Sequence, residues 1–172
     1  MKGCMAIDRQ KTETVHWHAV FTASRAEKKV RDRLEELGVE CFLPVQTVLR
    51  QWTYRKSRVV VPVIAGLVFV RVSRQEQVKV LQTKGVVAFL RLKGEAGAAV
   101  IPDKQMEDFR FLLDFSEEAV EMTNENIKAG DLVRVVKGSL RGMEGELIRH
   151  KGVTKVLVRI DMLGCAMVNI PA

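Results

Sequence analysis

Residues 59–72 read Val-Val-Val-Pro-Val-Ile-Ala-Gly-Leu-Val-Phe-Val-Arg-Val, and this stretch sets the class of fold. β-Branched and aromatic residues dominate it, which predicts two strands, 59–63 and 67–72, joined at Ala65-Gly66. The apolar run 59–70 is 12 residues long and contains a proline and a glycine. Because it is too short to cross a bilayer as a helix, the sequence does not indicate a membrane protein.

The sequence before this stretch predicts a strand, a helix and an extended segment. Apolar and polar residues alternate over 15–21, as in a half-buried strand. Ser24 and Glu27 have the spacing of a helix capping box, and Gly38 stands where that helix should end. Residues 39–49 are expected to be extended, and Pro44 indicates an edge strand or an irregular one.

The sequence after it predicts two helices on either side of a strand. Ser73 and Glu76 form a second capping box, whose helix should end near Gly85. A strand is expected over 86–92, and Pro102 opens a third helix with four apolar residues turned inward. The order β-α-β-β-α-β with a last helix indicates an α+β, ferredoxin-like domain with an antiparallel sheet. The inward residues of the last helix are Met106, Phe109, Leu112 and Leu113.

Residues 127–172 have a different pattern, with short apolar strands, frequent glycines and no helix signal. Gly138, Gly142 and Gly145 punctuate the turn after the first strand, where glycine permits tight corners. Several short strands in about 45 residues predict a small SH3-like β-barrel. The expected strands are 132–136, 146–149, 155–160 and 166–170.

The chain has 172 residues and a net charge of +7, which is spread unevenly. Residues 14–115 carry 17 basic and 11 acidic side chains, and 127–172 carry eight basic and four acidic. Residues 116–126 carry four acids and no base. This pattern predicts a disordered extension over 1–13, then two basic domains joined by an acidic linker that few contacts cross. A solvated helix end is the alternative for the acidic stretch.

Cysteine and histidine give no sign of a catalytic or metal centre. Cys4, Cys41 and Cys165 stand far apart, which indicates reduced thiols in a cytosolic protein. Zinc-ligand spacing is absent, which disfavours a metal site from Cys4, His16 and His18. Histidines on one strand face more often make hydrogen bonds or contact a partner than catalyse. Because the sequence also lacks hydrolase, nucleotide-binding and metalloprotease motifs, no enzyme activity, cofactor or metal is expected.

A run of basic and aromatic residues lies between Glu40 and Glu76, where the sequence has no acid. Basic side chains pair with phosphates and aromatic rings stack on unpaired bases, so the run is a candidate nucleic-acid site. A solvated loop whose aromatic rings cover the edge of the core is the alternative, and composition leaves both open. The run comprises Arg50, Trp52, Tyr54, Arg55, Lys56 and Arg58.

Several motifs together resemble the NusG family of transcription elongation factors, over residues 14–172. Gly130-Asp131-Leu132-Val133-Arg134-Val135, followed by Lys137-Gly138, Gly142 and Gly145, is similar to a KOW motif. Trp17-His18-Ala19-Val20 and Ala65-Gly66-Leu67-Val68-Phe69-Val70 are similar to two strands of the NGN domain. Residues 50–56 resemble the Arg-x-Trp-x-x-Arg-Lys pattern of specialised paralogues, the UpxY-like antiterminators of capsular-polysaccharide operons, which are functional cousins of RfaH.

The resemblance implies a mechanism without covalent chemistry. The NGN domain docks on the clamp helices of the largest RNA polymerase subunit and disfavours paused states, and it can contact upstream or non-template DNA. The KOW domain recruits a small-subunit ribosomal protein or the termination factor Rho. A monomeric, cytoplasmic factor with no membrane partner is therefore expected to suppress pausing or termination in polysaccharide operons. A housekeeping NusG, or a KOW-type RNA- or ribosome-binding module, is the alternative.

The resemblance also implies roles for individual residues. An apolar patch is expected to bind polymerase and to stay exposed in the free protein, because β-branched residues and glycines favour a permanent barrel over a helical hairpin in residues 131–170. The patch comprises Phe21, Ile64, Leu67 and Phe69, and the alternative for Phe69 is that it is a core residue only. Positions that lie toward DNA correspond to Arg25, Arg33, Thr83 and Lys84. Apolar loop tips that bind the second KOW partner correspond to Leu140 and Leu163.

Overall fold

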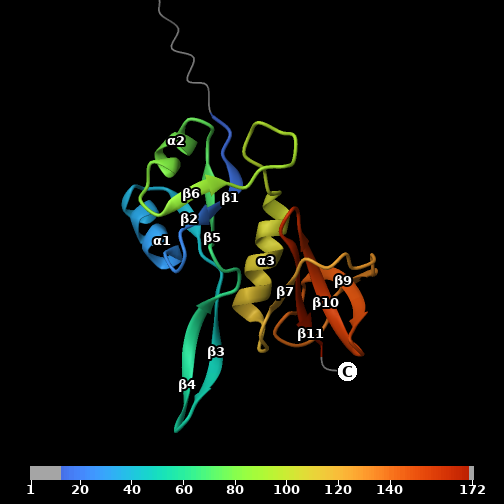
Figure 1. The fold of residues 1–172 in the computed structure, drawn as a ribbon. Helices are drawn as coiled ribbons and strands as arrows, with labels where there is room; N and C mark the ends of the chain where they lie inside the picture. The colour runs from blue at the N-terminus through green and yellow to red at the C-terminus, as the bar shows by residue number, and fades with distance from the viewer. Residues whose placement is uncertain (1–12, 171–172) are drawn as a thin grey trace, which may run out of the picture.

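The computed structural model describes residues 13–170, so nearly all of the predicted N-terminal extension, with Cys4, lies outside the described residues. The described chain forms a four-stranded sheet, a five-stranded sheet, a two-stranded hairpin and three helices (Figure 1). The helices are α1 (Glu27–Glu36), α2 (Glu76–Leu81) and α3 (Asp103–Phe115). The strands are β1 (His16–Thr22), β2 (Glu40–Phe42), β3 (Val45–Trp52), β4 (Arg55–Pro62), β5 (Leu67–Val72), β6 (Val86–Phe89), β7 (Glu121–Thr123), β8 (Asp131–Arg134), β9 (Glu144–His150), β10 (Val153–Ile160) and β11 (Gly164–Asn169).

The four-stranded sheet has the order β2-β5-β1-β6, and every neighbouring pair is antiparallel. This is the predicted split-βαβ order, and it places β1 and β5 at the centre. Alternation along β5 turns Val68 and Val70 toward one face, where they pack with Val30 and Leu34 of α1. The two short helices α1 and α2 therefore cover this face of the sheet.

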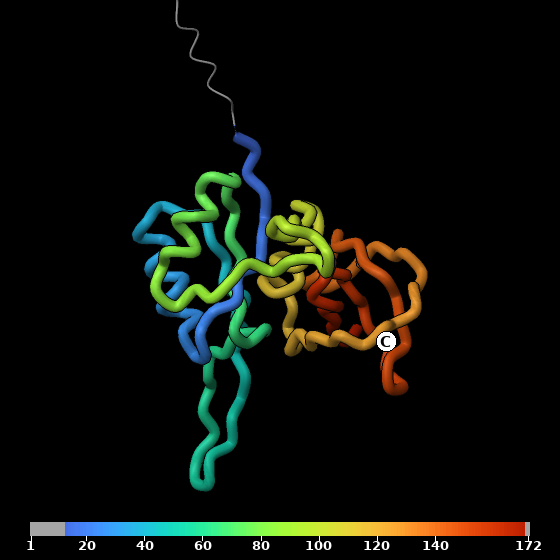
Figure 2. Tube along the Cα trace, turned by 45° about the horizontal axis from the view of Figure 1, so that its top comes forward, coloured from blue at the N-terminus to red at the C-terminus, as the bar shows by residue number. Residues whose placement is uncertain are grey.

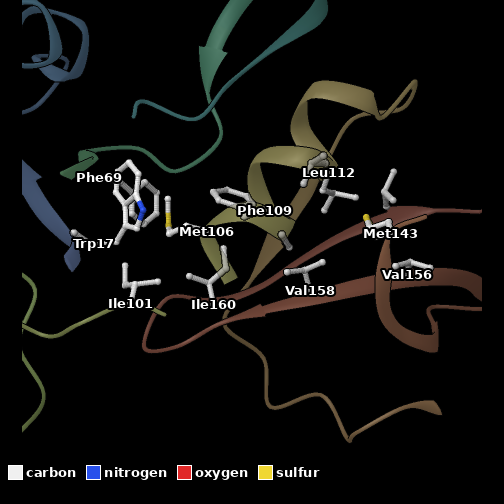
Figure 3. Packing of buried hydrophobic residues seen from close by; sticks show 14 of the residues in the cluster. Trp17, Phe69, Ile101, Met106, Phe109, Leu112, Met143, Val156, Val158 and Ile160 are labelled. Atoms are coloured by element: carbon white, nitrogen blue, oxygen red, sulfur yellow. The ribbon is translucent and has the colours of Figure 1, made fainter. Parts of the chain in front are cut away.

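The opposite face of the same sheet is covered by α3. Trp17 and Phe69 pack there against Met106, Phe109 and Leu112, which project from one side of the helix (Figure 3). Three of the four residues predicted to point inward on this helix are fully buried, and Leu113 is half-buried. The centre of the sheet is thus enclosed on both faces.

The five-stranded sheet has the order β7-β11-β10-β9-β8 and is antiparallel throughout. Its last four strands are the four that the sequence predicted, within a few residues at each end. Val158 and Ile160 of β10 pack against α3 on the side away from the first sheet, in the same core as Phe69 (Figure 3). Figure 2 shows this sheet beside α3 and away from α1. The chain therefore has a mixed α/β fold with antiparallel sheets and few helices.

The acidic segment 116–126 is part of this packing. Val120 is buried, and β7 pairs with β11 through Met122 and its neighbours. The side-chain amide of Gln46 makes two hydrogen bonds with the backbone of Val120. The expectation that few contacts cross this segment was wrong, because Val120 and Met122, which lie among its acidic residues, pack in the core shared by the two larger sheets.

Residues 45–62 form a hairpin that projects from the body of the protein (Figures 1 and 2). β3 and β4 pair from Val45 with Pro62 to Trp52 with Arg55, which leaves a two-residue turn, Thr53-Tyr54. The strand predicted over 59–63 is therefore an arm of this hairpin rather than a strand of the main sheet. Among the described strands, β3 pairs only with β4, so these two strands form a ribbon that joins neither of the larger sheets.

The two predicted capping boxes have different outcomes. Ser73 and Glu76 form one, with the Ser73 N–H donating to Glu76 at 2.9 Å and the Glu76 N–H donating to the serine hydroxyl at 3.4 Å. Glu27 instead turns away from Ser24, and its carboxylate accepts a hydrogen bond of 2.7 Å from the Gly66 N–H. A tertiary contact has replaced the local one. Within residues 13–170, no helix is long and apolar enough to cross a membrane.

Candidate functional site

An apolar groove lies between the two larger sheets. Phe21, at the end of β1, and Ile64, in the turn before β5, form one wall, and Leu163 of the five-stranded sheet belongs to the opposite wall. The groove has a volume of about 430 Å³, and Phe21 is 40% exposed beside it. The structure thus brings together residues that the sequence assigned to two different binding sites. The remaining lining residues are Val63, Ala65, Leu67, Leu90, Met122, Asn124 and Met162.

Two members of the predicted polymerase patch are almost wholly buried: Leu67 lines the groove, and Phe69 belongs to the core. Leu67 is 2% exposed, and Phe69 has no exposed surface. The ring of Phe69 lies 6.0 Å from that of Phe109 and 6.2 Å from that of Phe42, between centroids. These are the distances of aromatic rings packed in a core. Only Phe21 and Ile64, of the four predicted residues, reach the surface in this structure.

The accessible wall of the groove is fixed by a buried carboxylate. Glu27, 7% exposed, accepts the hydrogen bond from the Gly66 N–H, and the Gly66 carbonyl in turn accepts one of 2.9 Å from the Thr22 N–H. Gly66 has a φ of +71°, a conformation that glycine adopts without steric cost. The turn that carries Ile64 is therefore held against the end of β1, where Phe21 lies.

The hairpin tip distributes the predicted nucleic-acid residues over two faces. Directly paired residues of an antiparallel ladder share a face, and successive residues alternate. Trp52 pairs with Arg55, and Arg50 with Ser57, so Arg50, Trp52 and Arg55 lie on one face. Lys56 pairs with Gln51 and Arg58 with Leu49, which places both of these cations on the other face. Tyr54 is 98% exposed in the turn itself.

The second predicted nucleic-acid cluster is partly assembled. The Arg33 guanidinium donates a hydrogen bond of 2.7 Å to the Lys84 carbonyl, so these two residues lie together. The loop that contains Arg25 is joined to the same region, because the Ala23 N–H donates to the Gly85 carbonyl at 2.8 Å. Thr83 is 7% exposed, and its hydroxyl donates to a carbonyl of its own helix. The cations of Arg25, Arg33 and Lys84 therefore remain available for contact with DNA at this corner. The side chain of Thr83 is buried and is not available.

The five-stranded sheet contains a cavity that sequence reasoning missed. It has a volume of about 520 Å³ and lies between the β8–β9 connection and the end of β11. Leu140, predicted as a partner-binding loop tip, lines it and is 8% exposed. Strand alternation alone gives no signal for this cavity, because its apolar lining comes from several strands and the β8–β9 connection, which are distant in the sequence. The apolar lining residues are Val133, Val135, Val136, Leu140, Leu147, Val168 and Ile170.

His18 has a structural environment. Its Nδ1 lies 2.8 Å from the carbonyl oxygen of Ala99, to which it donates, and its ring meets the edge of Phe89. Burial lowers the pKa of His18 below its usual value, which favours the neutral ring. His16 is exposed two residues earlier on the same face. No three metal-ligating side chains come together within residues 13–170.

Comparisons with known proteins identify one family. A family model described as transcription termination factor nusG matches residues 15–110, which include the whole four-stranded sheet and the hairpin. No curated protein matches the sequence.

Several solved structures are similar to the chain over most of its length. One is described as domain interaction in Thermotoga maritima NusG, with 21% identity and a TM-score of 0.49, covering 91% of this chain and 93% of that one. Two conformations of the MjSpt4:Spt5 complex also match. Conformation B has 17% identity and a TM-score of 0.31, over 91% of this chain and 99% of that one. Conformation A has 16% identity and a TM-score of 0.30, over 90% and 99%.

Proposed function

The chain belongs to the NusG family of transcription factors, and from that premise we propose that it is an elongation and antitermination factor that binds RNA polymerase. The observation that carries this proposal is the family match over 15–110, which covers the four-stranded sheet and the hairpin. In this proposal the NGN domain comprises 14–115, and it acts by binding the active state of polymerase more tightly than the paused state. Such an effect needs no catalytic residue.

The polymerase contact is proposed at Phe21 and Ile64. Both lie beside the groove: Ile64 is on the turn that the Glu27–Gly66 hydrogen bond holds in place, and Phe21 is near the end of β1. An apolar residue that is partly exposed at a concave surface is the usual form of an interface anchor. Leu67 and Phe69 support these residues from below. Because Leu163 lines the opposite wall, a helix of the polymerase clamp must enter the groove or displace this wall.

The test is retention of the full-length chain on purified core polymerase. Phe21→Ala and Ile64→Ala should each weaken retention by roughly 5- to 150-fold, the effect of truncating an anchor worth about 1–3 kcal/mol. Leu81→Ala is the matched control, because Leu81 is also a partly exposed apolar residue, 43% against 40% for Phe21. Unchanged retention in both groove variants would contradict the proposed contact.

The same assay separates the family function from a rival. An RNA- or ribosome-binding module would use the basic residues of the hairpin directly on RNA, which their exposure permits. Such a module would need RNA for retention, whereas the proposed factor binds core polymerase without RNA. Retention that is abolished by nuclease treatment would favour the rival.

Residues 127–172 are proposed to be a KOW domain with an SH3-like barrel fold, following the acidic segment 116–126. Its partner would be a small-subunit ribosomal protein or Rho, in contact with Leu163 and the region of Leu140. Support comes from the antiparallel order of strands β8 to β11 and from the strand, not helix, assignment of residues 131–134 and 144–169 outside the connecting turns. Crosslinking from Leu163 to purified partners tests this assignment.

The specialisation is proposed from the hairpin tip. Arg50, Trp52, Arg55 and Lys56, which carry the resemblance to UpxY-like paralogues, are all exposed there and free for contact with DNA. We propose that the protein is a cytoplasmic monomer that acts on polysaccharide-biosynthesis operons, through upstream or non-template DNA. The position of its gene at the head of such an operon is the decisive observation. A position outside any such operon would favour a housekeeping factor instead.

A further inference from the structure

We propose that the hairpin formed by β3 and β4 enters the major groove of duplex DNA with its tip first, so that its two faces meet the two phosphate backbones. The inference rests on the proposed nucleic-acid role of the hairpin and goes beyond it, because it names the form of nucleic acid and the mode of entry. A basic composition alone attracts the phosphates of any nucleic acid, so it specifies neither the form of nucleic acid nor the mode of entry.

The first argument is the distribution of charge. Arg50 and Arg55 lie on one face of the ribbon, and Lys56 and Arg58 lie on the other. All four are exposed, and none makes an ion pair or hydrogen bond with another described residue. A platform for a single strand combines cations with aromatic rings, and the face with Arg50, Trp52 and Arg55 alone would supply both. Such a platform leaves the cations of the opposite face, Lys56 and Arg58, without a role. Two cations on each face suit a ribbon that has a phosphate backbone on either side.

The second argument is the shape of the hairpin. From the Val48–Val59 pair outward, four further pairs of residues precede the turn. At about 3.3 Å per residue these extend about 13 Å. The major groove of B-form DNA is about 12 Å wide and about 8.5 Å deep and admits a two-stranded ribbon. The free part of the hairpin is therefore long enough to reach the floor of the groove.

The third argument is the chemistry of the tip. Gln51, Thr53 and Tyr54 lie at or beside the turn and are exposed. Amide and hydroxyl groups can bond the edges of bases, and apolar side-chain atoms can contact the thymine methyl group. No acidic residue occurs between Glu40 and Glu76, so nothing on the hairpin repels the phosphates. The major groove of A-form RNA is deep and narrow and excludes such a ribbon, so the occupant is B-form DNA.

The experiment measures binding of the full-length protein to a fluorescent DNA duplex of about two helical turns by anisotropy, over a series of salt concentrations. The duplex should bind more tightly than either of its single strands and more tightly than an RNA duplex of the same sequence. The pair Arg50→Gln/Arg55→Gln should reduce the salt slope by about 1.8, at about 0.9 for each phosphate contact. The pair Lys56→Gln/Arg58→Gln should reduce it by the same amount.

The matched control is Lys128→Gln/Arg149→Gln, which removes two exposed cations from the five-stranded part of the chain. Its salt slope should equal that of the unmodified protein. Tighter binding to a single strand than to the duplex, or equal binding to the RNA duplex, would overturn the proposal. A salt slope that changes only in Arg50→Gln/Arg55→Gln, the pair on the face of Trp52, would also overturn it. So would the absence of duplex binding in the unmodified protein.

Retention on core polymerase, measured in parallel, keeps this inference separate from the proposed function. The hairpin variants should keep full retention, because their substitutions are remote from Phe21 and Ile64. If the unmodified protein is not retained on core polymerase, the proposed function is contradicted and the duplex-binding result still stands. A preference for single strands contradicts the groove proposal and leaves the polymerase result standing.

Discussion

Gln46 and Val120 lie 74 residues apart, and the side-chain amide of the first holds both backbone polar groups of the second. The Val120 N–H donates to Oε1 of Gln46 at 2.9 Å, and Nε2 of Gln46 donates to the Val120 carbonyl at 3.2 Å. The root of the hairpin is thereby joined to the segment that leads into β7.

Gln46→Ala should lower the free energy of unfolding by about 1–3 kcal/mol, because two partly buried backbone groups lose their partners. Urea denaturation followed by circular dichroism measures the change. Gln51→Ala is the control, since Gln51 is exposed on the same strand, and it should change the free energy by less than about 0.5 kcal/mol. Equal effects of the two substitutions would show that the two Gln46–Val120 hydrogen bonds contribute nothing to stability.

Phe69→Ala should behave as a core truncation. Phe69 is fully buried between Phe42 and Phe109, so the substitution should cost about 3–5 kcal/mol of folding stability. Phe21→Ala, at a position that is 40% exposed, should cost markedly less. Thermal and urea unfolding of both variants measures this difference. A small cost at Phe69 would mean that α3 does not cover the ring in solution.

His18 should make stability depend on pH below neutrality. Burial lowers its pKa from the usual 6.5, and the Ala99 hydrogen bond opposes this only in part. The folded state therefore binds a proton less readily than the unfolded state. Its contribution is fully present above pH 6.5 and is lost as the pH falls from 6.5 toward the folded-state pKa. The free energy of unfolding should decrease in that range.

The corresponding variant is His18→Gln, in which this part of the pH dependence should disappear even if overall stability is lower. His16→Gln should keep most of it, because burial is the main cause of the lowered pKa of His18 and the charge of the exposed His16 is a smaller one. Urea midpoints between pH 7 and pH 5 provide the measurement. A pH dependence that survives His18→Gln assigns the effect to another group.

Glu27 should stabilise the protein as a hydrogen-bond acceptor. Glu27→Ala leaves the Gly66 N–H without its partner and should cost about 1.5–3 kcal/mol, as for hydrogen bonds to charged groups. Glu27→Gln retains an acceptor oxygen and should recover part of this loss. Glu36→Ala, on an exposed turn of the same helix, is the control. Equal stability of Glu27→Ala and this control would contradict the assigned role.

The secondary structure of the first sheet could be predicted because local and tertiary preferences agree there. Gly38 has a φ of +74° at the end of α1, and Ser73 with Glu76 caps α2, as their spacing indicates. The capping box at Ser24 and Glu27 was wrong for a tertiary reason. The Gly66 N–H, 39 residues away, takes the carboxylate, and sequence spacing holds no information about that partner.

The hairpin and the burial of the patch could not be predicted for related reasons. The turn Thr53-Tyr54 lacks the asparagine and glycine that signal a two-residue hairpin, so the sequence contains no hairpin signal at the basic run. Alternation did place Leu67 and Phe69 on one face of β5. Which element covers that face depends on the path of the chain after Pro102, and the pattern of Met106, Phe109 and Leu112 shows only that α3 has an apolar side.

The packing of α3 has a thermodynamic consequence for the whole chain. Phe109 and its neighbours on this helix contact the four-stranded sheet, while β10 packs against the same helix from the other direction. Neither sheet can lose the helix without exposing apolar surface of the other, so the heat of melting should be absorbed in one transition rather than two. A chain cut after Phe115 would leave half of the helix surface wet, and its heat capacity change on unfolding would be smaller than its length implies.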